Sequence, residues 1–321
     1  MLRKLKCIAY RSKEKLGWSF FTRVQTYDLE YKIVLKNNCD GSKDVVLVFP
    51  VAFSTDFQKL LNGVNFSKNN ISILNDELFG NPYVSLEVNL KPDGHYCLEE
   101  KFRVSVSPAL PLTRKKYTFD QYDEEILSKV KNFMTPNSFI DFESKELMAA
   151  ASAIKIDGDV MKTARAIYRY VITHLEYKNP ILGLYTANQA FEQREVDCGG
   201  FSSLFVAMAI ACGIPARIVS GFLAGYRSNS MHAWAEFMLP DGQWIPVDAA
   251  VEQEFNRGKT RVSGKFGFIG SDRVVFSRGC GIPVMIRGKQ VVIDILQNPF
   301  IYPEMKDNEV SVTVQCITKT L

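Results

Sequence analysis

The chain of 321 residues is long enough for two domains, and its content of 46% hydrophobic and 23% charged residues is that of an ordinary globular protein. The net charge of +4 is small for this length and no basic motif accompanies it, so the composition gives no reason to expect nucleic acid as a partner. The longest apolar stretch, Leu204 to Ala224, is interrupted by Gly213, Pro215 and Arg217, and we expect no membrane span there.

The N-terminal residues carry no predicted export signal. Met1 to Lys6 is basic, but residues 7–18 are interrupted by charges and lack the apolar segment of a secretory leader. Seven cysteines form no close pair and no C-x-x-C metal motif, and they lie at positions 7, 39, 97, 198, 212, 280 and 316. We therefore expect reduced thiols and a cytoplasmic location.

Residues 24–106 are predicted to form an antiparallel β-sandwich of the usual size. From Tyr27 to Lys36, apolar and polar residues alternate with the period of a half-buried strand, apart from Val34. Residues 54–79 are poorly patterned, and we expect a long connection there with room for one more strand. Further strands are predicted at Val45–Phe49, Tyr83–Leu90 and Tyr96–Val106.

Two prolines in residues 107–112 mark a predicted boundary between a sandwich domain at 1–110 and a second domain at 111–321. Helices are predicted in the second domain over Tyr122–Met134, Ser144–Ile154 and Asp159–Leu175. Strands expected to finish or back its sheet are predicted at Arg273–Phe276, Gln290–Leu296 and Val310–Thr318.

Cys198 comes shortly before an apolar stretch of helical length, Phe201–Cys212, which stops before Gly213. Cys198 is therefore predicted at a helix N-terminus, where unpaired N–H groups and the macrodipole favour a thiolate. Because Gly199 and Gly200 have no side chains, a substrate carbonyl could approach the backbone there, as an oxyanion site requires. Taken alone, a cysteine in this position is more often a buried core residue.

A predicted hairpin brings a histidine and a carboxylate together. Met231–Leu239 is predicted as a strand and Gln243–Val247 as its return, joined by the turn sequence Pro-Asp-Gly. This three-residue loop places Asp248 opposite Trp234, on the same face as His232 and diagonally adjacent, about 7–8 Å away between backbones. A two-residue loop would put them on opposite faces. The chain has only three histidines, and this one is favoured as functional over a packed strand residue.

Cys198, His232 and Asp248 are the side chains that a thiol nucleophile needs: a thiolate, an imidazole to hold its proton, and a carboxylate to fix the imidazole's tautomer. A zinc site made of the same three residues is disfavoured, because zinc sites usually combine cysteine and histidine. We therefore predict these three as the catalytic residues, with no metal and no cofactor.

Other residues of the segment support weaker predictions. Arg217 is expected to form a structural ion pair and is left out of the site. Trp234 and Glu236 share the face of His232 by alternation, and either packing or a place in the cleft wall would explain them. The polar loop 226–230 is expected to rim the cleft. Tyr177 is favoured as a core residue over a contributor to an oxyanion site.

The segment from Arg194 to Ala249 resembles the transglutaminase-like (Cys-His-Asp) superfamily, especially the bacterial and archaeal transglutaminase-core proteins. One departure is Val196, where many relatives carry glycine two residues before the nucleophile. It removes no catalytic atom. The resemblance rests on four motifs in order, D-C-G-G-F-S-S-L-F from Asp197, C-G-I-P-A-R-I-V-S-G-F from Cys212, M-H-A-W-A-E-F from Met231 and W-I-P-V-D from Trp244.

The resemblance implies an α+β fold in which the sandwich is followed by a papain-like core, with helices packed on an antiparallel sheet. It also implies that Cys198 attacks an amide or acyl carbonyl, that His232 shuttles the proton and that Asp248 orients His232. The family includes protein cross-linkers, peptidases, amidases and members that have lost activity. It does not fix the acyl acceptor.

We expect hydrolysis of a peptide, isopeptide or side-chain amide in a peptide or protein substrate, because water is the default acceptor unless a pocket excludes it. Transamidation stays open. A non-catalytic binding protein that retains the fold as a scaffold is the other open class, since fold alone does not fix function.

Overall fold

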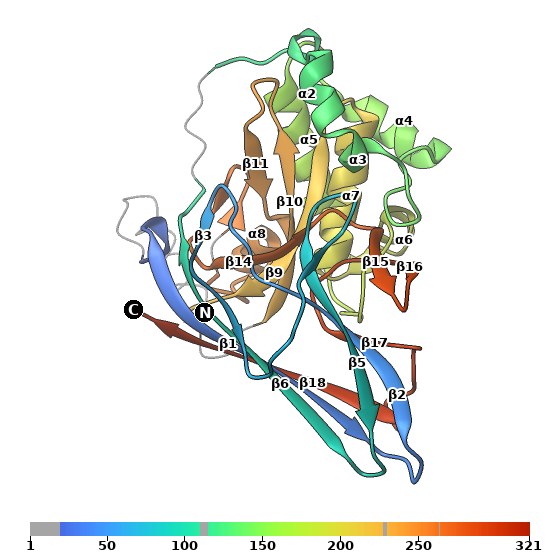
Figure 1. Ribbon diagram of the computed structural model, residues 1–321. Helices are drawn as coiled ribbons and strands as arrows, with labels where there is room; N and C mark the ends of the chain where they lie inside the picture. The colour runs from blue at the N-terminus through green and yellow to red at the C-terminus, as the bar shows by residue number, and fades with distance from the viewer. Residues whose placement is uncertain (1–19, 110–114, 227–229, 263) are drawn as a thin grey trace.

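The computed structural model describes residues 20–109, 115–226, 230–262 and 264–321. Two four-stranded sheets lie in its lower part in Figure 1, with the strand orders β18-β1-β6-β3 and β17-β2-β5-β4. Their strands are β1 (Gln25–Asn37), β2 (Lys43–Pro50), β3 (Gln58–Phe66), β4 (Leu74–Asn75), β5 (Pro82–Leu90), β6 (His95–Val106), β17 (Phe300–Tyr302) and β18 (Val310–Thr320).

The predicted antiparallel sandwich is confirmed. Burial alternates along β1, as the sequence predicts, and its inward side chains pack with those of β2, β5 and β6 in one apolar cluster. The predicted strands in residues 45–49, 83–90 and 96–106 are present as β2, β5 and β6. The poorly patterned region holds two strands, β3 and β4, where the sequence suggests room for one.

The placement of the C-terminal strand is a correction. Residues 310–318 form a strand as predicted, but β18 pairs with β1 over Tyr27 to Asn37 and does not back the sheet of the second domain. The short strand β17 likewise pairs with β2. Periodicity in sequence reveals a strand but not its distant partner, and β1 has a free edge that β18 covers. The domain boundary near residue 110 stays a prediction, although β17 and β18 come after it in the chain and pair with strands that come before it.

Helices dominate residues 115–211. The predicted helices at 144–154 and 159–175 are confirmed, with Ser144 and Asp159 as their N-caps. The helix predicted at 122–134 is split at Val130, whose φ of −115° and ψ of 8° interrupt the helix. The helical elements are η1 (Phe20–Thr22), η2 (Phe119–Gln121), α2 (Glu124–Lys129), α3 (Lys131–Met134), α4 (Lys145–Ile154), α5 (Val160–His174), α6 (Ala187–Gln193), α7 (Cys198–Ala211) and α8 (Ala249–Asn256).

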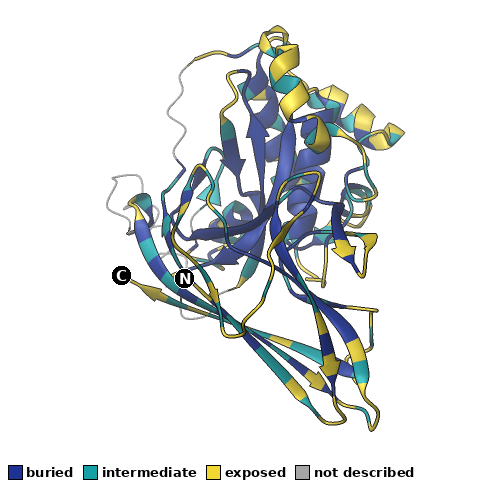
Figure 2. Ribbon diagram, viewed as in Figure 1, coloured by how far each residue is buried: buried dark blue, intermediate teal, exposed yellow. Residues whose placement is uncertain are grey.

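A third antiparallel sheet, in the order β11-β10-β9-β14, is the central sheet of the molecule. Helix α7 packs against it, and α4, α5, α6 and α8 surround α7 (Figure 1). Figure 2 shows that α7 and this sheet are buried, whereas exposed residues gather on α2, α3 and α4. The strands are β9 (Ala216–Leu223), β10 (Met231–Met238), β11 (Trp244–Val247) and β14 (Arg273–Arg278).

The central sheet and the sandwich share an apolar core. Phe222, Val274 and Phe276 of the central sheet belong to the same apolar cluster as the inward side chains of the sandwich. The shared cluster fixes the position of the sandwich relative to the sheet that carries the candidate site.

Short strands complete the fold. The strand predicted at 290–296 does not join the central sheet but forms a hairpin with a strand that the sequence analysis missed, β15. Within the described ranges, no helix has the length and apolar character needed to cross a membrane. The short strands are β7 (Glu176–Tyr177), β8 (Glu195–Val196), β12 (Gly264–Lys265), β13 (Phe268–Ile269), β15 (Ile282–Ile286) and β16 (Lys289–Ile293).

Candidate active site

Cys198 is the first residue of α7, at the helix N-terminus that the sequence predicts. Asp197 caps the helix by accepting the N–H of Gly200 at 3.2 Å, and its second carboxylate oxygen accepts the N–H of Ile181 at 3.2 Å. Gly199–Ile210 is buried, whereas Cys198 is partly exposed. The helix therefore presents a thiol near the surface, where the positive end of its dipole favours a thiolate.

The two glycines after Cys198 serve capping and packing. Their N–H groups donate to the carboxylate of Asp197, so the expectation that they form an oxyanion site is not supported. A Cβ atom on Gly200 would lie only 2.6 Å from the Cβ of Val196. Glycine at position 200 thus makes room for the valine by which this chain departs from the family pattern.

The hairpin of β10 and β11 has the predicted register. Ala235 pairs with Val247, which puts Asp248 opposite Trp234 and diagonal to His232. His232 Nε2 lies 2.8 Å from Asp248 Oδ2, and both side chains are buried. The turn sequence therefore predicted correctly that the imidazole and the carboxylate would meet.

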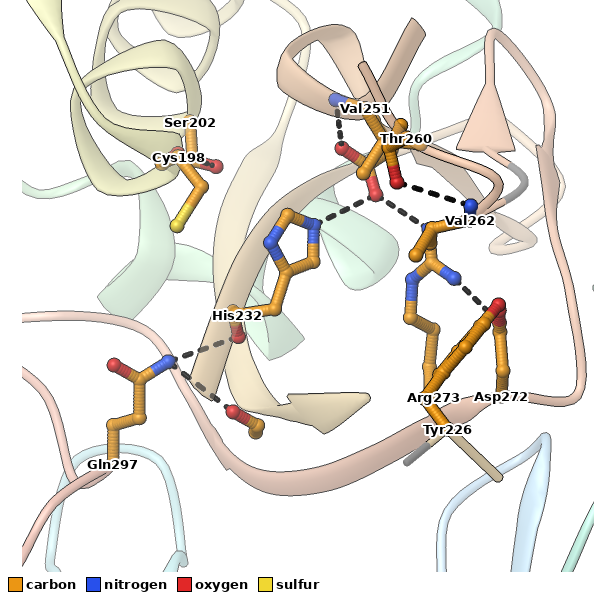
Figure 3. Close-up of polar contacts among 12 residues, drawn as sticks. Cys198, Ser202, Tyr226, His232, Val251, Thr260, Val262, Asp272, Arg273 and Gln297 are labelled. Atoms are coloured by element: carbon orange, nitrogen blue, oxygen red, sulfur yellow. Dashed lines mark hydrogen bonds and ion pairs between the residues drawn. The ribbon is translucent and has the colours of Figure 1, made fainter. Parts of the chain in front are cut away.

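The other side of the imidazole faces the cysteine. Figure 3 shows the sulfur of Cys198 directed toward the ring of His232, on the side of the ring nitrogen that does not contact Asp248. Cys198 is also among the groups that raise the pKa of His232. The structure thus brings together all three residues that the sequence proposes for the site.

Asp248 is held by three further groups besides His232. As the N-cap of α8, its Oδ1 accepts the N–H of Val251 at 3.1 Å. Its Oδ2 accepts a second hydrogen bond from Arg273 Nη2 at 2.7 Å, and Arg273 also pairs with Asp272. The backbone carbonyl of Asp248 accepts the hydroxyl of Tyr168 at 3.2 Å. The contacts from Val251 and Arg273 hold the carboxylate beside the imidazole, and the contact from Tyr168 holds the backbone of Asp248.

Sequence reasoning missed Arg273, which it placed only as the start of a strand. The side chain is 1% exposed, an unusual environment for an arginine unless its charge is paired. The available signal was Asp272-Arg273 at the head of Val-Val-Phe, a charged pair that leads directly into an apolar strand. Arginine and aspartate are mostly exposed residues, so the sequence pattern by itself favours an exposed strand end.

The charges of the site stabilise a protonated imidazole. Burial alone would lower the pKa of His232, but its interactions with Asp248 and Cys198 raise it to about 10. Burial would raise the pKa of Asp248, but His232 and Arg273 hold it below its usual range. The raised pKa favours the imidazolium form of His232, which lies between a carboxylate and the cysteine; an imidazolium beside a cysteine is the arrangement that activates a thiol.

The backbone of His232 is also fixed. Gln297 Nε2 donates to the carbonyl of His232 at 2.9 Å and to that of its strand partner Gly221 at 3.3 Å. A Cβ on Gly221 would lie 1.8 Å from the carbonyl oxygen of Val274, so only glycine fits between β9 and β14 here. Trp234 stacks at 6.2 Å from the imidazole, on the face expected from alternation.

Arg217 has the structural role that the sequence predicts. It lies opposite Glu236 across β9 and β10, and its Nη2 is 2.7 Å from Glu236 Oε2 in a buried ion pair. The guanidinium also lies 3.7 Å from the ring centroid of Trp244. Burial lowers the pKa of Arg217 to about 10, although the negative charge of Glu236 acts to raise it. Neither member of this pair is a candidate for substrate binding.

Tyr177 and the loop before β10 adjoin the site. Tyr177 is half-buried; burial first, and then the charge of Cys198, raise the pKa of its phenol. Of the loop expected to rim the cleft, residues 227–229 lie outside the described residues. Ser230 at its end lines a pocket together with Tyr177 and His232.

Comparison with known proteins agrees with this geometry. Residues 149–249 match the model of the Transglutaminase-like superfamily. An uncharacterised protein of Haemophilus influenzae is 25% identical over an alignment of 162 residues, and the match covers 38% of this chain and 44% of that protein. The match thus spans less than half of the length of this curated relative.

The structure of a proposed cysteine protease from Cytophaga hutchinsonii superposes on this chain with a TM-score of 0.61 at 18% sequence identity. The superposition covers 92% of this chain and 91% of that protein, so the two share a fold over nearly their whole length. Residues 149–249 of this α+β chain, which hold Cys198, His232 and Asp248, therefore form a transglutaminase-like core of papain-like fold.

Proposed function

We propose that the protein is a thiol-dependent amidohydrolase in which Cys198 is the nucleophile, His232 the acid and base, and Asp248 the group that orients His232. One observation carries the proposal: His232 Nε2 lies 2.8 Å from Asp248, and the imidazole is turned toward the partly exposed Cys198 at the start of α7. The match to the Transglutaminase-like superfamily supports a thiol-dependent enzyme.

The first half-reaction forms a thioester. The Cys198 thiolate attacks the carbonyl carbon of an amide, and the C–N bond breaks when the imidazolium of His232 gives its proton to the leaving amine. In the second half-reaction, water attacks the thioester, His232 accepts a proton from the water, and the C–S bond breaks. The products are a carboxylic acid and the regenerated thiolate.

Water is the proposed acceptor because Cys198 is partly exposed and the site opens onto a pocket that water can enter. A peptide, an isopeptide or a side-chain amide is the proposed substrate, since each presents the carbonyl that a thiolate attacks. An amine as the acceptor would give transamidation by the same thioester. A cytoplasmic location is part of the same proposal, based on the odd number of dispersed cysteines.

The proposal is tested by incubating the protein and its Cys198→Ala variant with a library of peptide and side-chain amides and weighing the products. Hydrolysis adds water across the amide, whereas transamidation joins the acyl group to an amine, so product mass separates the two. We expect products from the wild-type protein alone. Equal conversion by the Cys198→Ala variant would contradict the role of Cys198 as the nucleophile, and no conversion by either protein would favour a non-catalytic binding protein.

A further inference from the structure

A pocket of about 180 Å³ adjoins His232. It is smaller than the roughly 300–1,000 Å³ of sites that enclose whole small molecules, so it suits one side chain of a larger ligand. Residues of β7, β9, β10 and α8 and of the segment after α8 line it, among them Leu223, Met231, Val251, Glu254 and Val262.

Aliphatic side chains form one part of the pocket wall. Leu223, Val251 and Val262 form a small apolar cluster of their own, separate from the main cores, and Met231 and Ala250 extend the apolar wall. In the view of Figure 3, Val251 and Cys198 lie on different sides of the imidazole. Because apolar side chains lie beside His232, an apolar substituent is favoured on the amine that receives the proton of His232.

The one carboxylate among the described lining residues lies near two basic side chains. Glu254 Oε1 is 3.5 Å from Lys259 Nζ and 3.9 Å from Arg257 Nη1, although no hydrogen bond from a described residue reaches this oxygen. The apolar cluster of Leu223, Val251 and Val262 favours an aliphatic side chain in the pocket, and Glu254 is the one described lining group that would favour a basic side chain instead.

We infer that this pocket binds an aliphatic side chain on the amine component of the substrate. The inference rests on the proposed function, because it assumes that His232 gives its proton to the leaving amine. The nitrogen of the leaving amine must come within hydrogen-bonding distance of the imidazole. A substituent on that nitrogen then enters the space of which His232 is a wall. By microscopic reversibility, an amine that attacks the thioester occupies the same pocket.

The test uses the second half-reaction, so that the natural substrate need not be known. p-Nitrophenyl acetate acylates Cys198: the thiolate attacks the ester carbonyl, the C–O bond breaks and p-nitrophenolate leaves. Glycinamide or L-leucinamide then competes with water for the acetyl thioester. The amine nitrogen attacks, His232 takes its proton, and the thiolate leaves. Mass spectrometry gives the ratio of N-acetyl amide to acetate for each amine.

We expect L-leucinamide to capture the acetyl group at least roughly 10-fold better than glycinamide, because a single methylene in an apolar pocket is worth about that much. Val251→Phe fills the pocket and should remove most of this preference. Val292→Phe is the matched control, since Val292 is 60% exposed on β16 and should leave the preference intact. If Val251→Phe does not fold, the preference of the wild-type protein for L-leucinamide over glycinamide still tests the inference.

Equal capture of the two amines would overturn the inference while leaving the proposed function intact. Better capture of L-lysinamide than of L-leucinamide would overturn the aliphatic assignment and identify Glu254 as the selecting group. Absence of any thioester on Cys198 would overturn the proposed function and the inference with it.

Discussion

Arg273 donates a 2.7 Å hydrogen bond to Asp248 Oδ2, the same oxygen that accepts the hydrogen bond of His232. Both Arg273 and Asp248 are 1% exposed, so neither charge is compensated by water. The arginine therefore keeps the carboxylate ionised and fixes its orientation toward the imidazole. A cysteine, a histidine and an aspartate form the candidate site, but a buried arginine holds it in place.

Replacing Arg273 should separate orientation from charge. We expect Arg273→Met to lower both amide turnover and the free energy of unfolding, the latter by about 3–5 kcal/mol, because it removes the buried cation that Asp248 and Asp272 share. Arg273→Lys keeps the charge but cannot reach Asp248 and Asp272 with one planar group, so turnover should fall more than stability. Denaturant unfolding and turnover measure the two effects, and Arg287→Met, at an exposed ion pair, is the control. Wild-type turnover in Arg273→Lys would contradict this role.

The three candidate catalytic residues should rank by role. Cys198→Ala should reduce turnover to background, and His232→Ala should be nearly as severe, because the thiolate loses its proton acceptor and counter-charge. Asp248→Asn should cost less, although a related triad loses very roughly 10⁴-fold from this change.

Asp248→Asn is the most informative of these variants, because asparagine caps a helix about as well as aspartate and should leave α8 intact. Circular dichroism and thermal unfolding check that each variant is folded. A harmless Asp248→Asn substitution, together with loss of folding in Cys198→Ala, would show that the three residues are structural.

The pH dependence should reflect the raised pKa of His232. The value of kcat/KM should fall at high pH as the imidazolium loses its proton. The alkaline limb of the pH profile should lie near the pKa of about 10 rather than near 6.5. Because the folded-state pKa lies above the ordinary value, the stabilisation from His232 is complete below about 6.5 and is lost as pH rises through about 10. Asp248→Asn should move the alkaline limb to lower pH. An unchanged limb in that variant would contradict the pairing.

Removal of residues 1–110 tests the predicted domain boundary. A chain that begins at residue 111 keeps every candidate catalytic residue but removes β1, the partner of β18, and the apolar cover of Phe222, Val274 and Phe276. We expect this truncated chain to be insoluble or unfolded, as judged by gel filtration and circular dichroism. A soluble truncated chain with a reactive Cys198 would support two independent domains divided near residue 110.

What could be predicted from the sequence was local. The Pro-Asp-Gly loop sets the register that joins His232 to Asp248, and the apolar run after Cys198 sets the helix that presents the thiol. The pairing of β18 with β1 depends on residues almost 300 positions apart, and no local pattern encodes it. Arg273 escaped prediction for the same reason, because its partner Asp248 lies 25 residues away on another element.

The most direct test of the candidate site is the rate at which iodoacetamide alkylates each cysteine near neutral pH, mapped by peptide mass spectrometry. Cys39 and Cys97 are internal controls, because they are partly exposed like Cys198. A thiolate stabilised by His232 and the start of α7 should make Cys198 react at least about 10-fold faster than these two, and His232→Ala should abolish the difference. Alkylation of Cys198 no faster than of the controls, or undiminished in His232→Ala, would contradict its role as the nucleophile.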